Sequence, residues 1–180
     1  MSKRLVVLAV FALCTVLMFG GCAQSVGDTL DNVGSTIGNA VGQLLSGDVT
    51  GETGKVYSTQ WFSFNVKSIK EVPEYAGYTP EDGYVLYDVL ITETCTFDES
   101  IPMGTFDFYM DDDSFSEPIY PIAPLDDTMM PDQFDLGADE TVEYHMIYEV
   151  PAEHTALKLM YTEVDEADNI GVTFTINIDS

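Results

Sequence analysis

The sequence predicts an all-β protein, an antiparallel β-sandwich of seven to nine short strands that follows a signal peptide and a flexible stalk. Hydrophobic residues recur at every second position in several segments beyond residue 55, which is the period of a half-buried strand. Turn chemistry such as "YTPEDGY" separates these segments. Beyond residue 54 no stretch has convincing helical spacing. Short strands joined by turns favour a sandwich.

Two long strands are expected first. In the segment 62–72, Phe62, Phe64 and Val66 alternate with polar residues, and a change of phase at Ser68 predicts a β-bulge. The segment 84–95 carries a row of hydrophobic side chains on one face: Val85, Tyr87, Val89 and Ile91. We therefore expect this face to point into the core.

Later strands follow the same rule. Segments 106–110 and 142–150 alternate, and segments 156–161 and 171–178 form a final pair. A short edge strand is expected at Ile119 and Tyr120, since prolines flank them. Residues 123–140 are predicted to form a long loop.

The first 22 residues predict the cellular location of the protein. Lys3 and Arg4 precede fifteen uncharged residues that would span roughly 22 Å as a helix, which is short of the ~30 Å hydrocarbon core of a membrane. This is the pattern of a secretory signal peptide, residues 1–21. "LMFGGC" resembles the lipobox of bacterial lipoproteins, which implies that Cys22 is lipidated and becomes the mature N-terminus. An uncleaved signal anchor and plain secretion are the alternatives.

Residues 22–53 are predicted to be the lipidated N-terminus and a Gly-rich stalk. Apolar residues recur at steps of three and four between Val26 and Leu44, and Gly34, Gly38 and Gly42 lie four apart. Glycine disfavours an isolated helix, so we expect a flexible stalk with transient helix. A membrane-lying or self-associating helix is the alternative. The sandwich domain is expected over residues 54–180.

The charge balance excludes one class of partner. The chain holds 31 Asp and Glu against 6 Lys and Arg, a net charge of −25. Nucleic-acid binding needs cationic side chains to neutralise phosphates, so no nucleic-acid partner is expected. A cation or a basic partner fits better, although high charge also serves solubility alone. The dense aromatic residues argue against disorder.

Acidic residues gather in two predicted loops. Asp111, Asp112 and Asp113 lie in one, and Asp126 and Asp127 in the other. If both loops meet at one end of the sandwich, their oxygens would suit Ca²⁺. The spacing does not match an EF-hand, because no glycine occupies the sixth position. Solvated surface loops are the alternative explanation, and no other cofactor is expected.

We expect no enzyme. His145 and His154 lack the helical spacing of a zinc protease, no G-x-S-x-G motif occurs, and His145 is expected to be exposed. Cys95 has no intramolecular partner once Cys22 is lipidated, so it is expected to be a buried structural residue.

Two loops offer hydrophobic side chains for binding. Tyr75 and Tyr78 flank a glycine-containing loop, and Met129 and Met130 precede a proline in another. Loops on a rigid sandwich often form binding surfaces. Packing of these side chains within the loops is the alternative.

The strings "TQWFSFNVKSIK", "GYVLYDVLITET", "GADETVEYHMIYEVP" and "TFTINI" occur in this order. Together they resemble an immunoglobulin-like domain of unknown function found in surface lipoproteins of Gram-positive bacteria, over residues 52–179. Members usually carry Asn-Thr after the central strand, where this chain has Thr92-Glu93-Thr94. The resemblance implies an immunoglobulin-like sandwich at the cell surface, and it implies no activity.

The expected function is therefore a non-catalytic binding domain, lipid-anchored to the outer face of the bacterial cell membrane, with a protein or glycan partner. The alternative is a module of the cell envelope that Ca²⁺ stabilises.

Overall fold

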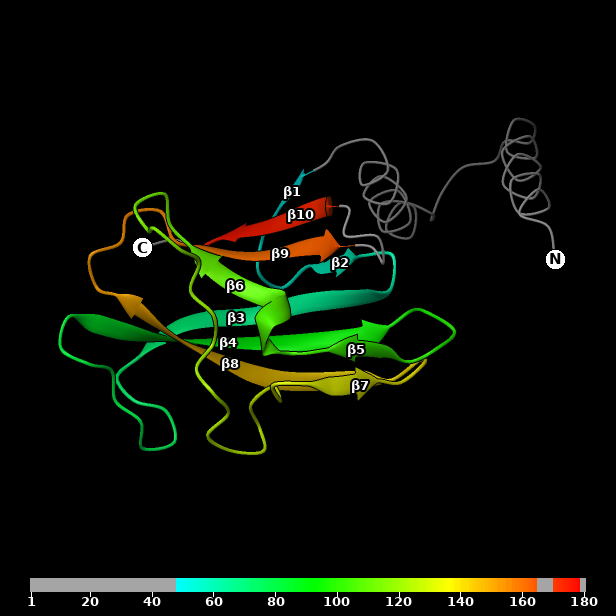
Figure 1. Ribbon diagram of the computed structural model, residues 1–180, viewed down its shortest axis with the longest axis horizontal. Coiled ribbons are helices and arrows are strands. Elements are labelled where there is room, and N and C mark those ends of the chain that lie inside the picture. The colour runs from blue at the N-terminus through cyan, green and yellow to red at the C-terminus, as the bar shows by residue number, and fades with distance from the viewer. Residues whose placement is uncertain (1–47, 165–169, 179–180) are drawn as a thin grey trace, which may run out of the picture. The chain divides into compact units, whose positions relative to one another are not determined.

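The strands form two four-stranded sheets that face each other (Figure 1). This computed structural model describes residues 48–164 and 170–178. The predicted signal peptide, Cys22 and most of the predicted stalk lie outside these residues. No helix in the described ranges is long and apolar enough to cross a membrane.

The first sheet has the order β1-β10-β9-β6, and its strands are β1 (Asp48–Gly51), β10 (Ile170–Asn177), β9 (Lys158–Val164) and β6 (Phe108–Asp111). The second has the order β2-β3-β4-β8, with β2 (Val56–Ser58), β3 (Phe62–Val72), β4 (Tyr84–Cys95) and β8 (Thr141–Pro151). A separate pair joins β5 (Ile101–Met103) to β7 (Phe134–Leu136), and a 3₁₀ turn, η1 (Thr105–Asp107), links β5 to β6.

The predicted fold class, an all-β and mainly antiparallel β-sandwich, is confirmed. The described ranges contain ten strands rather than seven to nine, because several are only three or four residues long. Strands β3, β4 and β8 pair antiparallel over most of their length, whereas β1 pairs parallel with β10. The bulge predicted near Ser68 is confirmed, since the β3–β4 register shifts between Val66 and Ser68.

Three expectations need correction. Strand β1 lies inside the segment assigned to the stalk, so the sandwich already includes residues Asp48–Gly51, which precede residue 54. Residues 123–140 are not all loop, because β7 pairs with β5 within them. Ile119 forms only an isolated bridge with Met110 instead of a strand.

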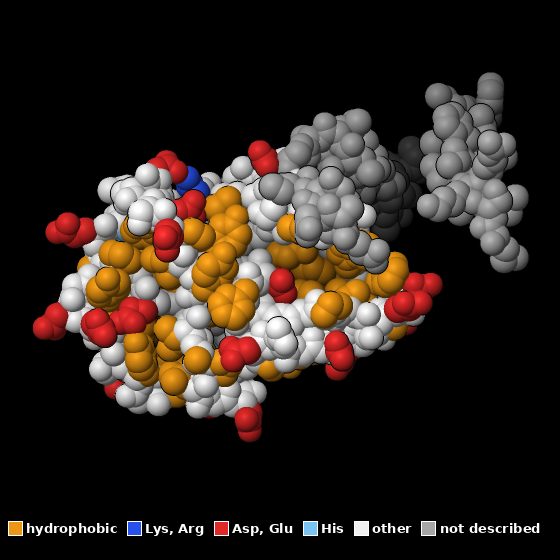
Figure 2. Space-filling view, in the orientation of Figure 1, with side chains coloured by type: hydrophobic (Ala, Val, Ile, Leu, Met, Phe, Trp, Pro, Cys, Tyr) orange, Lys and Arg blue, Asp and Glu red, His pale blue; other side chains and the backbone are white. Residues whose placement is uncertain are grey.

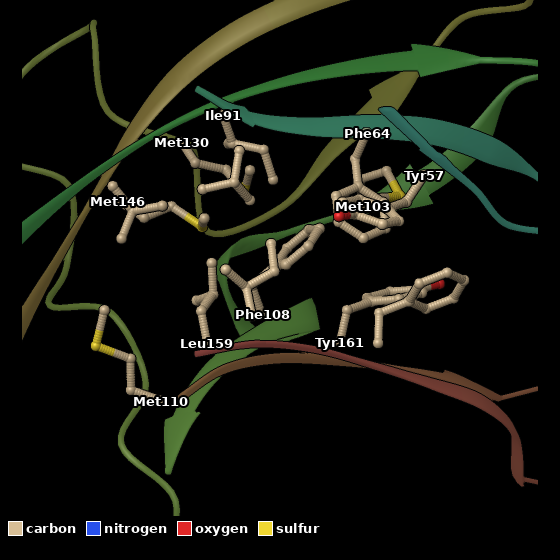
Figure 3. Packing of buried hydrophobic residues seen from close by; sticks show 14 of the residues in the cluster. Tyr57, Phe64, Ile91, Met103, Phe108, Met110, Met130, Met146, Leu159 and Tyr161 are labelled. Atoms are coloured by element: carbon tan, nitrogen blue, oxygen red, sulfur yellow. The ribbon is translucent and has the colours of Figure 1, made fainter. Parts of the chain in front are cut away.

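Aromatic rings fill the space between the two sheets (Figure 3). Phe64 of β3 lies at the centre, with its ring centroid 5.4 Å from those of Phe108 and Phe174 and 5.5 Å from that of Tyr57. The pairs with Phe108 and Phe174 are edge-to-face, and such pairs add to the free energy gained by burial. Both hydrophobic clusters lie within the described residues of one compact unit. The sandwich therefore contains its own core.

Carboxylates are scattered over the visible face of the sandwich (Figure 2). On the face in Figure 2, Asp and Glu side chains are spread over the surface, while Lys and Arg appear at one small place. Hydrophobic side chains remain visible between them. This distribution agrees with the acidic composition of the chain.

Candidate functional site

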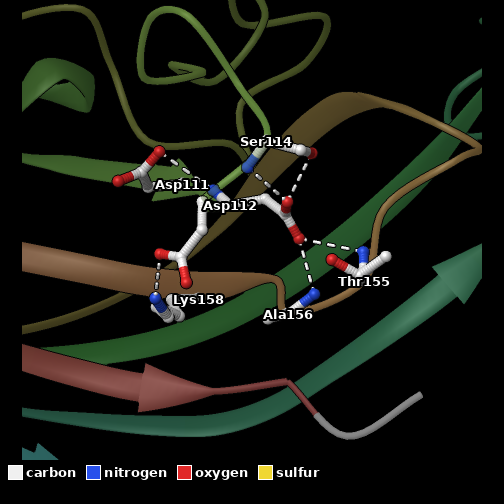
Figure 4. Close-up of polar contacts among 7 residues, drawn as sticks. Asp111, Asp112, Ser114, Thr155, Ala156 and Lys158 are labelled. Atoms are coloured by element: carbon white, nitrogen blue, oxygen red, sulfur yellow. Dashed lines mark hydrogen bonds and ion pairs between the residues drawn. The ribbon is translucent and has the colours of Figure 1, made fainter.

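Asp112, one of the predicted calcium ligands, is a buried structural acceptor. Its Oδ1 accepts hydrogen bonds from the backbone N–H of Ser114 at 2.9 Å and from the Ser114 hydroxyl. Its Oδ2 accepts from the N–H groups of Thr155 at 2.9 Å and Ala156 at 2.5 Å (Figure 4). The Ser114 hydroxyl and these N–H groups hold the pKa of the Asp112 carboxyl well below its usual range. The protein itself thus saturates this carboxylate.

The two neighbours of Asp112 make different contacts. Asp111 accepts the N–H of Asp112 at 2.9 Å, and Asp113 pairs with Lys158 at 2.7 Å (Figure 4). The Asp113 side chain is mostly exposed, so this ion pair is screened by water.

In the second acidic loop, Asp126 accepts the N–H and hydroxyl of Thr128, which lower the pKa of the Asp126 carboxyl. Asp127 is exposed. In the part of the chain that the structure describes, no group of three or more His, Cys, Asp or Glu residues could hold a metal ion. The arrangement gives the calcium hypothesis no support, and calcium binding stays a prediction.

The hydrophobic residues of the two loops pack into two different hydrophobic clusters. Met129 is buried with Leu86 and Ile147, and Tyr75 and Tyr78 pack against them on the outer face of the second sheet. Met130 belongs to the main core.

His145 was expected to be exposed, and the structure contradicts this prediction. Its side chain is half-buried, and its Nδ1 lies 2.7 Å from Oδ1 of Asp88. Cys95 is buried as predicted, with 1% of its surface exposed.

An open groove lies beside the η1 turn, and sequence reasoning did not single it out. Residues 102–104, 106–107 and 132–135 line a volume of about 580 Å³. The β5–β7 pair forms one part, because exposed Pro102 alternates with buried Ile101 and Met103. Gly104 lies against the chain at Asp132, where a Cβ would overlap the Asp132 carbonyl oxygen. Because Gly104 has no side chain, its segment can lie directly against the segment at Asp132.

Asp107 is the half-buried carboxylate of this groove. Its Oδ2 accepts the N–H of Gly104 at 2.7 Å, and burial raises the pKa of its carboxyl. No described hydrogen bond uses its Oδ1. Asp132 and Asp135 stand at the exposed rim. The groove thus offers one partly desolvated carboxylate and two solvated ones.

Glu93 is a second buried carboxyl near Asp107. It is fully buried on the core side of β4, between Phe64 of β3 and Val142 of β8 in the register. Neither side-chain oxygen has a hydrogen-bond partner within the described residues. Burial, followed by the negative charge of Asp107, raises the pKa of Glu93 to about 8. The sequence did contain a signal for it, because Glu93 continues the alternation of Val89 and Ile91.

No family model and no curated protein matches this sequence. The solved structures with a similar fold include three bacterial proteins. One is a candidate lipoprotein, ycdA of Bacillus subtilis, at 19% identity and a TM-score of 0.53, which covers 71% of this chain. This chain spans only 39% of that protein.

The other two match over nearly their whole length. The yjhA protein of Bacillus subtilis, at 14% identity and a TM-score of 0.56, covers 71% of this chain and 99% of its own. MPT63, a secreted protein of Mycobacterium tuberculosis, has 10% identity, a TM-score of 0.52 and coverage of 71% and 96%. Identities this low show the fold alone, so the chain shares a β-sandwich fold with these three bacterial proteins.

Proposed function

We propose that this chain is a non-catalytic binding domain, lipid-anchored through Cys22 to the outer face of a bacterial cell membrane. The observation that carries the binding role is the open groove of about 580 Å³ at the side of a rigid sandwich. Pockets of this size suit a small molecule or a segment of a partner.

The anchored location rests on the signal-like residues 1–21 and on the lipobox-like "LMFGGC". The fold similarity to a candidate lipoprotein and to a secreted protein supports an extracytoplasmic setting. Two acyl chains hold a protein stably at a membrane, whereas one does so only marginally. A diacylated Cys22 would therefore suffice as an anchor.

The test is metabolic labelling with radioactive palmitate in a Gram-positive host that expresses the full chain. We expect the wild-type protein to be labelled, to sediment with membranes and to be cleaved by protease added to protoplasts. Cys22→Ala should be unlabelled. Label that persists in Cys22→Ala, or a wild-type protein protected from protease, would contradict the anchoring. Turnover of a substrate that one substitution in the sandwich abolishes would contradict the non-catalytic role.

The alternative of a calcium-stabilised envelope module is testable separately. Thermal unfolding of residues 22–180 with Cys22→Ser should be compared in Ca²⁺, Mg²⁺ and NaCl at matched ionic strength. Screening of the net charge would stabilise with every salt alike. A rise specific to Ca²⁺ that Asp111→Asn with Asp113→Asn removes would establish the alternative.

A further inference from the structure

The chemistry of the groove selects a positively charged ligand. Of the nine lining residues three are Asp, and none is Lys, Arg or His. The chain as a whole carries a net charge of −25, which attracts cations over distance. Anionic ligands are repelled by such a lining, and neutral ligands gain no charge attraction from it.

Aromatic rings flank these carboxylates. Phe106 lines the groove with 64% of its surface exposed, and its ring centroid lies 5.5 Å from that of Tyr120, itself 41% exposed. Tyr109 continues the row at 6.0 Å from Tyr120. Phe134 lines the groove as well, and its ring packs on Tyr144. Cations are attracted to aromatic faces, and the planar guanidinium of Arg both stacks on rings and pairs with carboxylates.

The carboxylates are not arranged for a metal ion. Asp107, Asp132 and Asp135 do not form a metal-holding group, since no such group exists among the described side chains. A divalent cation needs several oxygens converging at 2.0–2.6 Å. An extended organic cation can instead reach each carboxylate separately.

Asp107 and Glu93 have carboxyl oxygens that accept no described hydrogen bond. Asp107 has one carboxylate oxygen outside the hydrogen bond to Gly104. Glu93 is a buried carboxyl with no described partner, and the charge of Asp107 acts on it. A positive charge held at Asp107 would offset the negative charge that helps to raise the pKa of Glu93.

We propose that the groove binds an arginine-bearing segment of a partner protein, with a guanidinium on Asp107 beside the ring of Phe106 and further cationic side chains at Asp132 and Asp135. The proposal deepens the proposed function, because it names the chemistry that the binding domain recognises. A peptide segment suits the open groove and the aromatic row that continues from it to Tyr109.

The test is fluorescence anisotropy with a fluorescein-labelled tetra-arginine peptide on residues 22–180 carrying Cys22→Ser, in 150 mM NaCl. We expect Asp107→Asn to raise the Kd about tenfold, the loss of one charged hydrogen bond. Asn keeps an acceptor for the Gly104 N–H, so the turn should remain folded. Asp82→Asn is the matched control, since Asp82 is exposed and away from the groove and its loss removes the same charge. It should change the Kd less than about twofold.

Two more comparisons identify the ligand. Tetra-lysine should bind at least about threefold more weakly than tetra-arginine, and Phe106→Ala should narrow that difference, because ring stacking favours guanidinium. Equal effects of Asp107→Asn and Asp82→Asn, or no tetra-arginine binding at millimolar concentration, would overturn the proposal. Competition by spermidine as effective as by tetra-arginine would overturn the peptide and point to a polyamine. Palmitate labelling of Cys22 is a separate measurement, so failure at the groove leaves the anchoring result intact.

Discussion

Asp112 accepts a hydrogen bond from the backbone N–H of Thr155, a residue 43 positions further along the chain. The oxygen that accepts this bond is Oδ2, and it also accepts the N–H of Ala156. One carboxylate therefore joins the loop after β6 to the loop between β8 and β9. This contact gives Asp112 a structural role, whereas calcium binding by the acidic loops stays a prediction.

Asp112→Asn should destabilise the sandwich, because an amide offers one acceptor oxygen where the carboxylate offers two. We expect a clear decrease in the thermal unfolding midpoint by circular dichroism. The control is Asp113→Asn, which breaks a mostly exposed ion pair with Lys158 and should leave the midpoint almost unchanged. Equal midpoints for both variants would contradict the structural role.

The same residue should make the protein sensitive to acid. Because the folded-state pKa of Asp112 is lowered, its stabilisation is present above the unfolded-state pKa, about 3.9, and is lost as the pH falls further. Urea unfolding between pH 5 and pH 2 should show a smaller loss of stability for Asp112→Asn than for the wild type.

Glu93 should make the stability of the fold fall as the pH rises, which is opposite to the pH dependence that Asp112 causes. Its folded-state pKa of about 8 lies above the ordinary value of 4.5, so the folded state binds the proton more tightly than the unfolded state. Its stabilisation is therefore lost as the pH rises through this window. Between pH 5 and pH 8 we expect the ionisation of Glu93 to lower the free energy of unfolding by on the order of 3 kcal/mol.

Glu93→Gln and Glu93→Met should both remove this decline, and the Met variant should be more stable than the wild type at pH 8. Glu74→Gln, an exposed control, should retain the wild-type dependence. Urea unfolding at pH 5, 6.5 and 8 measures the difference. Parallel profiles for Glu93→Met and the wild type would show that Glu93 does not titrate in this range.

Gly104→Ala should lower the stability of the folded protein. The new Cβ would overlap the carbonyl oxygen of Asp132, a backbone atom that moves only with its chain, and overpacking costs about 1–3 kcal/mol. In Gly137→Ala the new Cβ would meet the carboxylate end of the Glu140 side chain at 3.0 Å, which can rotate away. Urea unfolding should show the larger loss for Gly104→Ala.

Cys95 should be unreactive in the folded protein. Its burial leaves 1% of the side chain exposed, and thiol reagents need access to the sulfur. In residues 22–180 with Cys22→Ser it is the only thiol. Reaction with Ellman's reagent should be at least about 100-fold slower in buffer than in 6 M guanidinium chloride. Similar rates would mean that Cys95 is accessible.

The long strands were predictable because their alternation is a local property of the sequence. Phe62, Phe64 and Val66 define β3, and the change of phase at Ser68 marks its bulge. Strand β7 was not predictable in this way, since Phe134 and Leu136 stand in an acidic segment with turn-like composition. Its pairing with Ile101–Met103 depends on a contact that crosses more than thirty residues of sequence.

The site was less predictable than the fold. The acidic run at Asp111–Asp113 draws attention because charge is visible in a sequence, yet the hydrogen bonds of Asp112 come from loop residues that no spacing rule connects to it. Asp107 looks like an ordinary strand residue in "GTFDFYM", and only the approach of the segment at Asp132 gives it a groove. Burial of Glu93 follows from the alternation, but its lack of a partner does not.

The parallel pairing of β1 with β10 bears on how the domain could be released from a cell. The exposed connection 52–55 contains Lys55, and β1 lies before it while the rest of the sandwich lies after it. A protease that cut after Lys55 would leave β1 hydrogen-bonded to β10 over the four residue pairs from Asp48 to Gly51. Release of a domain held by the proposed lipid anchor at Cys22 would then need two events, the cleavage and the withdrawal of edge strand β1 from β10.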